Sequence, residues 1–120
     1  MLQNMIKHNY EEIRKRISEY VDPNAISIIA VTKYQTVEAA NEAIACGITE
    51  IGENKVQQLC ERDKLLLPAK RHLIGHLQSN KVKKIVGHVD TIQSVDSVSI
   101  AKEIGKRSVE SGVITNVLLE

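Results

Sequence analysis

The stretch ISIIAVT, at residues 26–32, is the segment that decides the fold of this 120-residue chain. In an extended backbone, Ile29 and Val31 lie on one face, while Ile28 and Ala30 lie on the other. A strand with two apolar faces is typical of a parallel sheet that is covered on both sides. We therefore predict a parallel strand buried on both faces here, and with it an α/β fold.

Strand and helix patterns alternate along the rest of the chain. The apolar spacing predicts an amphipathic helix over 6–20, which the turn around Pro23 ends. Periodicity and turn residues then predict helices over 37–46, 54–67, 80–86 and 98–110, and strands over 48–52, 71–74, 89–93 and 113–119. This repeat of strand and helix predicts βαβ units, a parallel sheet and right-handed crossovers.

Two architectures fit this alternation. A five-stranded, flavodoxin-like doubly wound sheet would close within a chain of this length. A (β/α)8 TIM barrel has eight such units and about 250 residues, so this chain would form its first half, preceded by the helix at 6–20. The chain stops in the apolar strand at 113–119, whereas a whole doubly wound domain normally ends with a helix. We expect the half barrel, as a single domain over 1–120, and keep the doubly wound sheet as the alternative.

Composition and charge argue against several classes of function. The 16 Lys and Arg residues against 15 Asp and Glu give a net charge of +1, which speaks against a nucleic-acid-binding arm. With no Phe or Trp, the chain also lacks the aromatic platforms that stack bases. We find no bilayer-spanning run and no secretory signal. Cys46 and Cys60 form no disulfide framework and no zinc pattern, and the histidines lack metal-ligand spacing, so we expect a cytoplasmic protein without a metal.

Polar residues follow the predicted strands at their carboxyl ends, where ligands bind in both architectures. Lys33 follows an almost wholly apolar run and shares a strand face with Ile29 and Val31, so we expect its amine to point into the barrel. A lysine enclosed by apolar side chains is a usable nucleophile toward carbonyls, although a lysine at a strand exit also reaches water. His72, within the third predicted strand, reads as a hydrogen-bonded core or edge histidine.

A basic cluster lies near the middle of the chain. It consists of Lys81, Lys83 and Lys84, with Lys70 and Arg71 nearby. At a net charge of +1, we interpret this cluster as a solvated helix face rather than a phosphate or RNA contact. The preceding stretch, IGHLQSNK at 74–81, offers backbone N–H groups that suit an anion, but we interpret it as a capped turn.

Four segments of the chain together resemble one protein family. They are AVTK at 30–33, IGEN at 51–54, HLIGHLQSNK at 72–81 and IQSVDS at 92–97. In this order and spacing they are similar to the pyridoxal phosphate (PLP) homeostasis proteins, small relatives of the alanine racemase N-terminal domain. The stretch at 74–81 is the most specific of the four. The resemblance runs from about residue 2 to residue 120, as the N-terminal half of the family's barrel.

This resemblance implies a TIM-type barrel of PLP fold type III, with PLP at its carboxyl face. Lys33 matches the family's Schiff-base lysine, and Asn54 matches the asparagine that lines the cofactor pocket. We add Gly75, His76 and Ser94, which end the third and fourth strands, to the predicted cofactor-binding residues. The family is regarded as PLP carriers or regulators of vitamin B6 balance, without established turnover. A fold type III amino-acid racemase or decarboxylase that uses the same lysine is the alternative.

The chain also departs from the family pattern. Gln35 stands where family members often carry a second lysine, two places after the Schiff-base lysine. The family's phosphate-binding loop and arginine lie in the second half of the barrel, which this chain lacks. We therefore expect a truncated chain that binds PLP weakly unless another chain completes the site. We also expect self-association through the open sheet edges, and PLP-dependent client enzymes as partners rather than nucleic acid or membranes.

Overall fold

A computed structural model describes the backbone of residues 2–120 and the side chains of residues 5–120. The strands are β1 (Ile29–Val31), β2 (Glu50–Glu53), β3 (Lys70–Leu73), β4 (Thr91–Val95) and β5 (Asn116–Leu119). The α-helices are α1 (Leu2–Ser18), α2 (Val37–Ala45), α3 (Val56–Arg62), α4 (Val82–Ile85) and α5 (Val98–Ser111), and the short 3-10 helices are η1 (Pro23–Ala25) and η2 (Ser79–Lys81). Within this described part, no helix is both long enough and apolar enough to cross a membrane.

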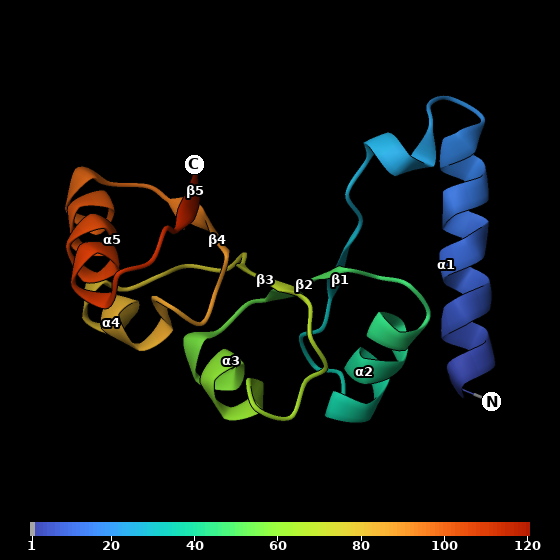
Figure 1. Ribbon diagram of the computed structural model, residues 1–120, viewed down its shortest axis with the longest axis horizontal. Coiled ribbons are helices and arrows are strands. Elements are labelled where there is room, and N and C mark those ends of the chain that lie inside the picture. Colours follow the sequence, from blue (N-terminus) through green and yellow to red (C-terminus); the bar gives the residue numbers. More distant parts are fainter. Residues whose placement is uncertain (1) are drawn as a thin grey trace.

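The order of the strands distinguishes between the two predicted architectures. All five strands form one sheet in the order β1-β2-β3-β4-β5, and every neighbouring pair is parallel. Helices α2, α3, α4 and α5 follow one another along the same side of the curved sheet (Figure 1). A doubly wound sheet instead reverses its strand order at a switch point, which places helices on both faces. The α/β prediction is confirmed, the flavodoxin-like alternative is wrong, and the arrangement agrees with the first half of a (β/α)8 barrel.

The hydrophobic core lies on the convex side of the sheet, beneath the helices. Ile51, Leu73 and Ile92 come from three neighbouring strands and are completely buried. The helices and their connections cover them with the buried side chains Val56, Leu59, Leu77, Val82, Ile85, Ile100 and Ile104. The concave face is open, and Val31 on it is 48% exposed. The predicted burial of the first strand on both faces is therefore wrong, because no segment of the described chain covers the concave side.

Helix α3 is shorter than the helix predicted over 54–67, and the reason lies in a contact with α2. The Asn41 side chain of α2 accepts a hydrogen bond from the Leu67 amide at 2.8 Å and donates one to the Leu65 carbonyl at 3.0 Å. Asn side chains compete in this way with helical hydrogen bonds for backbone groups. The chain therefore leaves the helix after Arg62 and turns toward β3.

Two glycines near the end of α5 have opposite backbone conformations. Gly112, just after α5, has a left-handed backbone with φ +67°, and its N–H caps the helix on the carbonyls of Ser108 and Val109. Gly105 lies inside the helix. A Cβ at either glycine would meet no atom within 4 Å.

We predict that Gly105→Ala raises the free energy of unfolding by about 1 kcal/mol, because alanine is the better helix former. Gly112→Ala should lower it by about 1 kcal/mol, because a Cβ disfavours the left-handed conformation. Urea denaturation of each variant measures both effects. Changes of the same sign in the two variants would contradict this account of the end of α5.

Candidate functional site

The carboxyl ends of β1 to β4 lie along one edge of the sheet, and backbone hydrogen bonds align them. The Thr32 amide donates to the Gly52 carbonyl at 3.0 Å, which joins the end of β1 to β2. The Ile74 amide donates to the Glu53 carbonyl at 2.9 Å, which joins the end of β3 to β2. The residues predicted at the cofactor site all lie at or just beyond these strand ends: Lys33, Asn54, Gly75, His76 and Ser94.

Gly75 lies directly against the backbone of Asn54. A Cβ at position 75 would stand 2.1 Å from the Asn54 carbonyl oxygen and 2.9 Å from its side-chain Oδ1, so no residue with a side chain fits. The hydroxyl of Ser94 donates to the Gly75 carbonyl at 2.6 Å and holds the same turn from the side of β4. Gly75 thus lets the ends of β2 and β3 approach each other because it has no side chain, and the buried Ser94 holds Gly75 in position.

Lys33 lies in the turn that follows β1, and its side chain is exposed. Its Nζ atom is 5.9 Å from the centroid of the Tyr34 ring. Tyr34 itself has a left-handed backbone with φ +62°, which is uncommon for a bulky residue. The predicted enclosure of Lys33 by apolar side chains is wrong, since the concave face beside it is open. His76 is also exposed, with Nδ1 at 3.9 Å from a carboxylate oxygen of Asp96.

A buried ion pair holds the turn that carries Lys33. The Glu53 side chain is 1% exposed, and its Oε1 accepts a hydrogen bond from the Thr32 hydroxyl at 2.6 Å. The Arg62 guanidinium lies 3.5 Å from the same oxygen. Arg62 also donates to the Thr32 carbonyl at 3.2 Å and to the Gln35 carbonyl. One guanidinium from α3 therefore fixes the backbone on both sides of Lys33.

A chain of polar side chains crosses the concave face. His72 on β3 hydrogen-bonds through Nε2 to Glu50 on β2 at 2.9 Å, and its Nδ1 accepts from the Gln93 amide on β4 at 3.0 Å. This pattern assigns the proton of neutral His72 to Nε2. The bond from His72 is the main reason that the pKa of Glu50 lies below its usual 4.5. The prediction that His72 is a hydrogen-bonded histidine is confirmed.

Sequence reasoning included Glu53 and Gln93 among the polar residues at the strand ends, but it did not identify Arg62 or Glu50 as parts of this region. Arg62 lies on a helix face whose composition resembles any solvated face, and only the fold brings it under the Lys33 turn. The alternation of side chains along β2, which puts Glu50 on the face opposite Ile51, was the available signal for a polar group on the concave face. In the described part of the chain, no three His, Cys, Asp or Glu side chains gather to hold a metal ion.

Comparison with known proteins gives a consistent result. No family model matches the chain. The chain is 35% identical over 99 residues to the pyridoxal phosphate homeostasis protein of Aquifex aeolicus, covering 81% of this chain and 43% of that protein. It is 30% identical over 127 residues to the protein of the same name from Escherichia coli, covering 98% of this chain and 54% of that protein.

The fold also matches a solved structure. PipY of Synechococcus elongatus, solved with PLP bound, superposes with a TM-score of 0.82 at 33% identity, covering 93% of this chain and 52% of PipY. The chain is therefore homologous to the pyridoxal phosphate homeostasis proteins, which confirms the predicted resemblance. It spans about half the length of the curated relatives that it matches.

We predict that Arg62→Met lowers the free energy of unfolding by about 3 kcal/mol, because it leaves the Glu53 carboxylate buried without its cation. Urea denaturation at neutral pH measures the loss. The matched control is the double variant Glu53→Gln/Arg62→Met, which removes both charges, keeps a hydrogen-bonding partner for Thr32 and should recover most of the lost stability. If the single and double variants unfold at the same urea concentration, the ion pair is not the stabilising contact.

Proposed function

We propose that the protein to which this chain belongs binds PLP for its intracellular homeostasis, with the cofactor attached to Lys33. The homology to PipY, which was solved with PLP bound, carries the proposal. The position of Lys33 supports it, because ligands of β/α barrels bind at the carboxyl ends of the strands. The exposed amine at the end of β1 is open to an incoming aldehyde.

The residues around Lys33 fit such a group. PLP supplies an aldehyde that reacts with primary amines, and an amine nucleophile must be positioned to use it. Arg62 and Glu53 hold the Lys33 turn in place, and Gly75 keeps the ends of β2 and β3 together. We propose Asn54 and His76 as polar contacts at the same edge, with Gly75 and Ser94 positioning them. We propose that residues 1–120 are one domain, the N-terminal half of a PLP-binding barrel, and that further chain supplies the phosphate contacts.

We also propose that this role is binding and delivery rather than catalysis. The relatives are named for homeostasis and not for a reaction. PLP-dependent enzymes are the proposed recipients of the cofactor. The cytoplasm is the proposed compartment, in keeping with the free thiols Cys46 and Cys60. Racemisation of an amino acid by the PLP-loaded protein would instead indicate an enzyme of fold type III.

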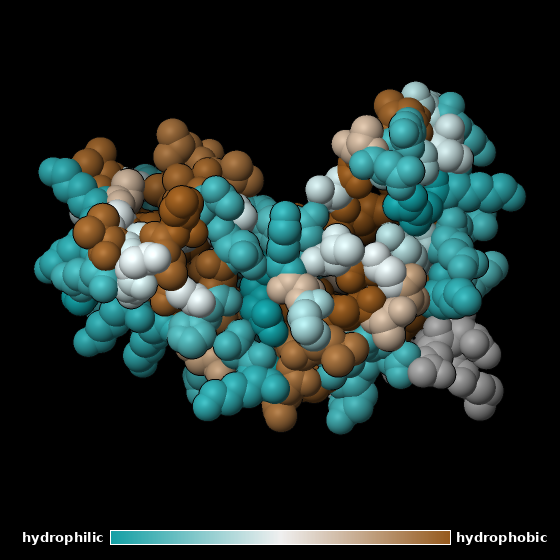
Figure 2. Space-filling view, viewed as in Figure 1, coloured by the Kyte–Doolittle hydropathy of each residue, from teal (hydrophilic) through white to brown (hydrophobic). Residues whose placement is uncertain are grey.

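The open edges of the sheet support self-association of this chain. Along the described residues, β1 pairs only with β2, and β5 pairs only with β4. Exposed apolar side chains gather at the β5 edge: Ile114 is 90% exposed, Leu118 53% and Leu119 82%. Figure 2 shows hydrophobic residues on the surface around β5 and the end of α5. Unpaired strand edges with apolar side chains invite pairing with another chain, so we propose a second copy as the occupant.

We predict that Lys33→Ala abolishes specific attachment of PLP, because it removes the positioned amine. Titration with PLP, borohydride reduction and peptide mass mapping measure the attachment on the unmodified chain and on the variant. Lys64→Ala, which removes an exposed lysine in the turn after α3, is the control and should change nothing. Labels spread equally over several lysines in all three proteins would contradict the proposed role of Lys33.

For self-association, we predict a mass above that of the monomer in sedimentation velocity. Leu118→Lys/Leu119→Lys should shift the protein toward the monomer, because lysines at an open strand edge oppose pairing. Leu65→Lys, in the turn after α3 and away from β5, also replaces an exposed apolar residue and should leave the mass unchanged. A monomeric mass of the unmodified chain at working concentration would refute the proposal.

A further inference from the structure

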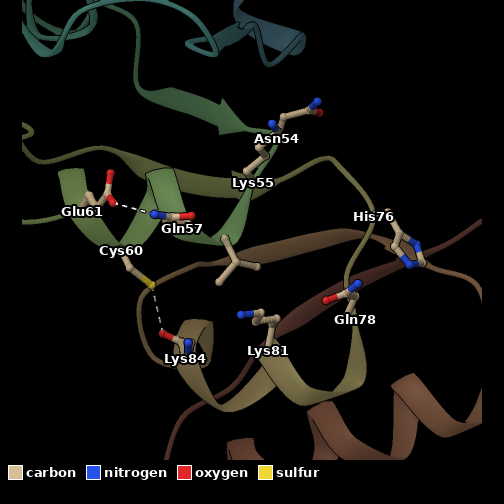
Figure 3. Close-up of a pocket in the computed structure, with 10 residues that line it drawn as sticks. Asn54, Lys55, Gln57, Cys60, Glu61, His76, Gln78, Lys81 and Lys84 are labelled. Carbon is tan, nitrogen blue, oxygen red and sulfur yellow. Dashed lines mark hydrogen bonds between the residues drawn. The ribbon is translucent and has the colours of Figure 1, made fainter.

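A groove of about 710 Å³ lies between α3 and the segment formed by η2 and α4. Figure 3 shows Gln57, Cys60 and Glu61 on the α3 side, with Lys81 and Lys84 on the opposite side. Lys55, just before α3, enters from the end of β2. The groove lies on the helical side of the sheet. Asn54 and His76, which we propose as cofactor contacts, line one end of the groove, so it adjoins the candidate site. Lys33 and the side chains of the concave face do not line it, and the lysines of the groove lie on the helical side of the sheet.

The charges that line this groove are unbalanced. Lys55, Lys81 and Lys84 face a single carboxylate, Glu61, which already accepts a hydrogen bond from the Gln57 amide at 3.0 Å. Within the described structure, no carboxylate pairs with any of the three lysines. Long cationic side chains gathered in a concave site without counter-charges attract an anion.

Arginines elsewhere in the chain show the contrast. Arg62, Arg71 and Arg107 each lie within ion-pair distance of a carboxylate. The lysines of the groove, in contrast, have no such carboxylate within the described structure, and they share one concave site. The expectation that the basic cluster is a solvated helix face suits Lys83, which does not line the groove, but Lys81 and Lys84 both do.

We propose that this groove binds a phosphorylated small molecule. The lysines suit a phosphate dianion as point charges, and the amides of Gln57 and Gln78 add neutral hydrogen-bond donors. The apolar Val56 and the Cys60 thiol give the same groove a surface for the uncharged part of the ligand. A concave site with few charges on a chain of net charge +1 favours a small ligand over an RNA backbone, which binds extended basic surfaces.

Cys60 provides a reporter for this site. Its side chain is exposed, and its thiol donates to the Lys84 carbonyl across the groove at 3.6 Å. Cys46 directly follows α2 and does not line the groove, so it serves as an internal reference. The experiment follows the labelling rate of each cysteine with N-ethylmaleimide, a neutral reagent, by peptide mass mapping. Inorganic pyrophosphate is the probe, added at constant ionic strength.

Pyrophosphate should slow the labelling of Cys60 in a saturable way and leave Cys46 unchanged. In Lys81→Gln/Lys84→Gln, the pyrophosphate concentration that halves the labelling rate of Cys60 should rise by at least about tenfold. A single charge-assisted hydrogen bond is worth about that factor in affinity. The control Lys102→Gln/Lys106→Gln removes the same charge from α5, outside the groove, and should behave like the unmodified chain. Circular dichroism verifies that both variants are folded.

Three results would overturn the proposal. The first is labelling of Cys60 that pyrophosphate does not slow. The second is equal weakening in the groove variant and in the α5 control, which would indicate a response to net charge alone. The third is stronger protection of Cys60 by a single-stranded RNA oligonucleotide than by pyrophosphate at equal phosphate concentration, which would assign the groove to a nucleic-acid backbone. The proposal does not depend on Lys33, so the labelling is repeated in Lys33→Ala, where the protection should persist.

Discussion

The close contact between Gly75 and the Asn54 backbone sets the arrangement of the candidate site. A Cβ at position 75 would stand 2.1 Å from the Asn54 carbonyl oxygen, a distance that no real side chain tolerates. Because this position has none, the ends of β2 and β3 meet, and the Ser94 hydroxyl then reaches the Gly75 carbonyl from β4. The polar groups that follow these strands are thereby gathered along one edge, and His76 joins them from the same turn.

An ion pair on the convex side of the sheet supports this edge. Glu53 is buried on the convex side of the sheet, where an isolated carboxylate is strongly unfavourable. Arg62 supplies the counter-charge and, through the same guanidinium, holds the carbonyls of Thr32 and Gln35. Because the buried Glu53 requires Arg62 as its counter-charge, the same guanidinium is also held in place to fix the turn that carries Lys33. Neither Glu53 nor Arg62 lies on the open concave face. Stability and the geometry of the candidate site depend on the same contact.

The two faces of the sheet have different characters. The convex face carries fully buried residues such as Leu73 and Ile92 under the helices. The concave face carries the chain of Glu50, His72 and Gln93, and it stays open along the described residues. A parallel sheet in chain order, with helices on one side and two unpaired edges, has room for further strands to close it. The chain spans about half the length of its curated relatives, in agreement with this geometry.

Local patterns in the sequence were enough to predict the order of the five strands and five α-helices, because apolar periodicity, glycine and proline act over a few residues. They also located Lys33, Asn54, Gly75, His76 and Ser94 at strand ends. The early end of α3 was not predictable, since it depends on Asn41, more than twenty residues away. Strand order, the open concave face, and the pairing of Arg62 with Glu53 were decided only by the tertiary structure. The reason is physical: long-range contacts select one topology from several that share the same local pattern.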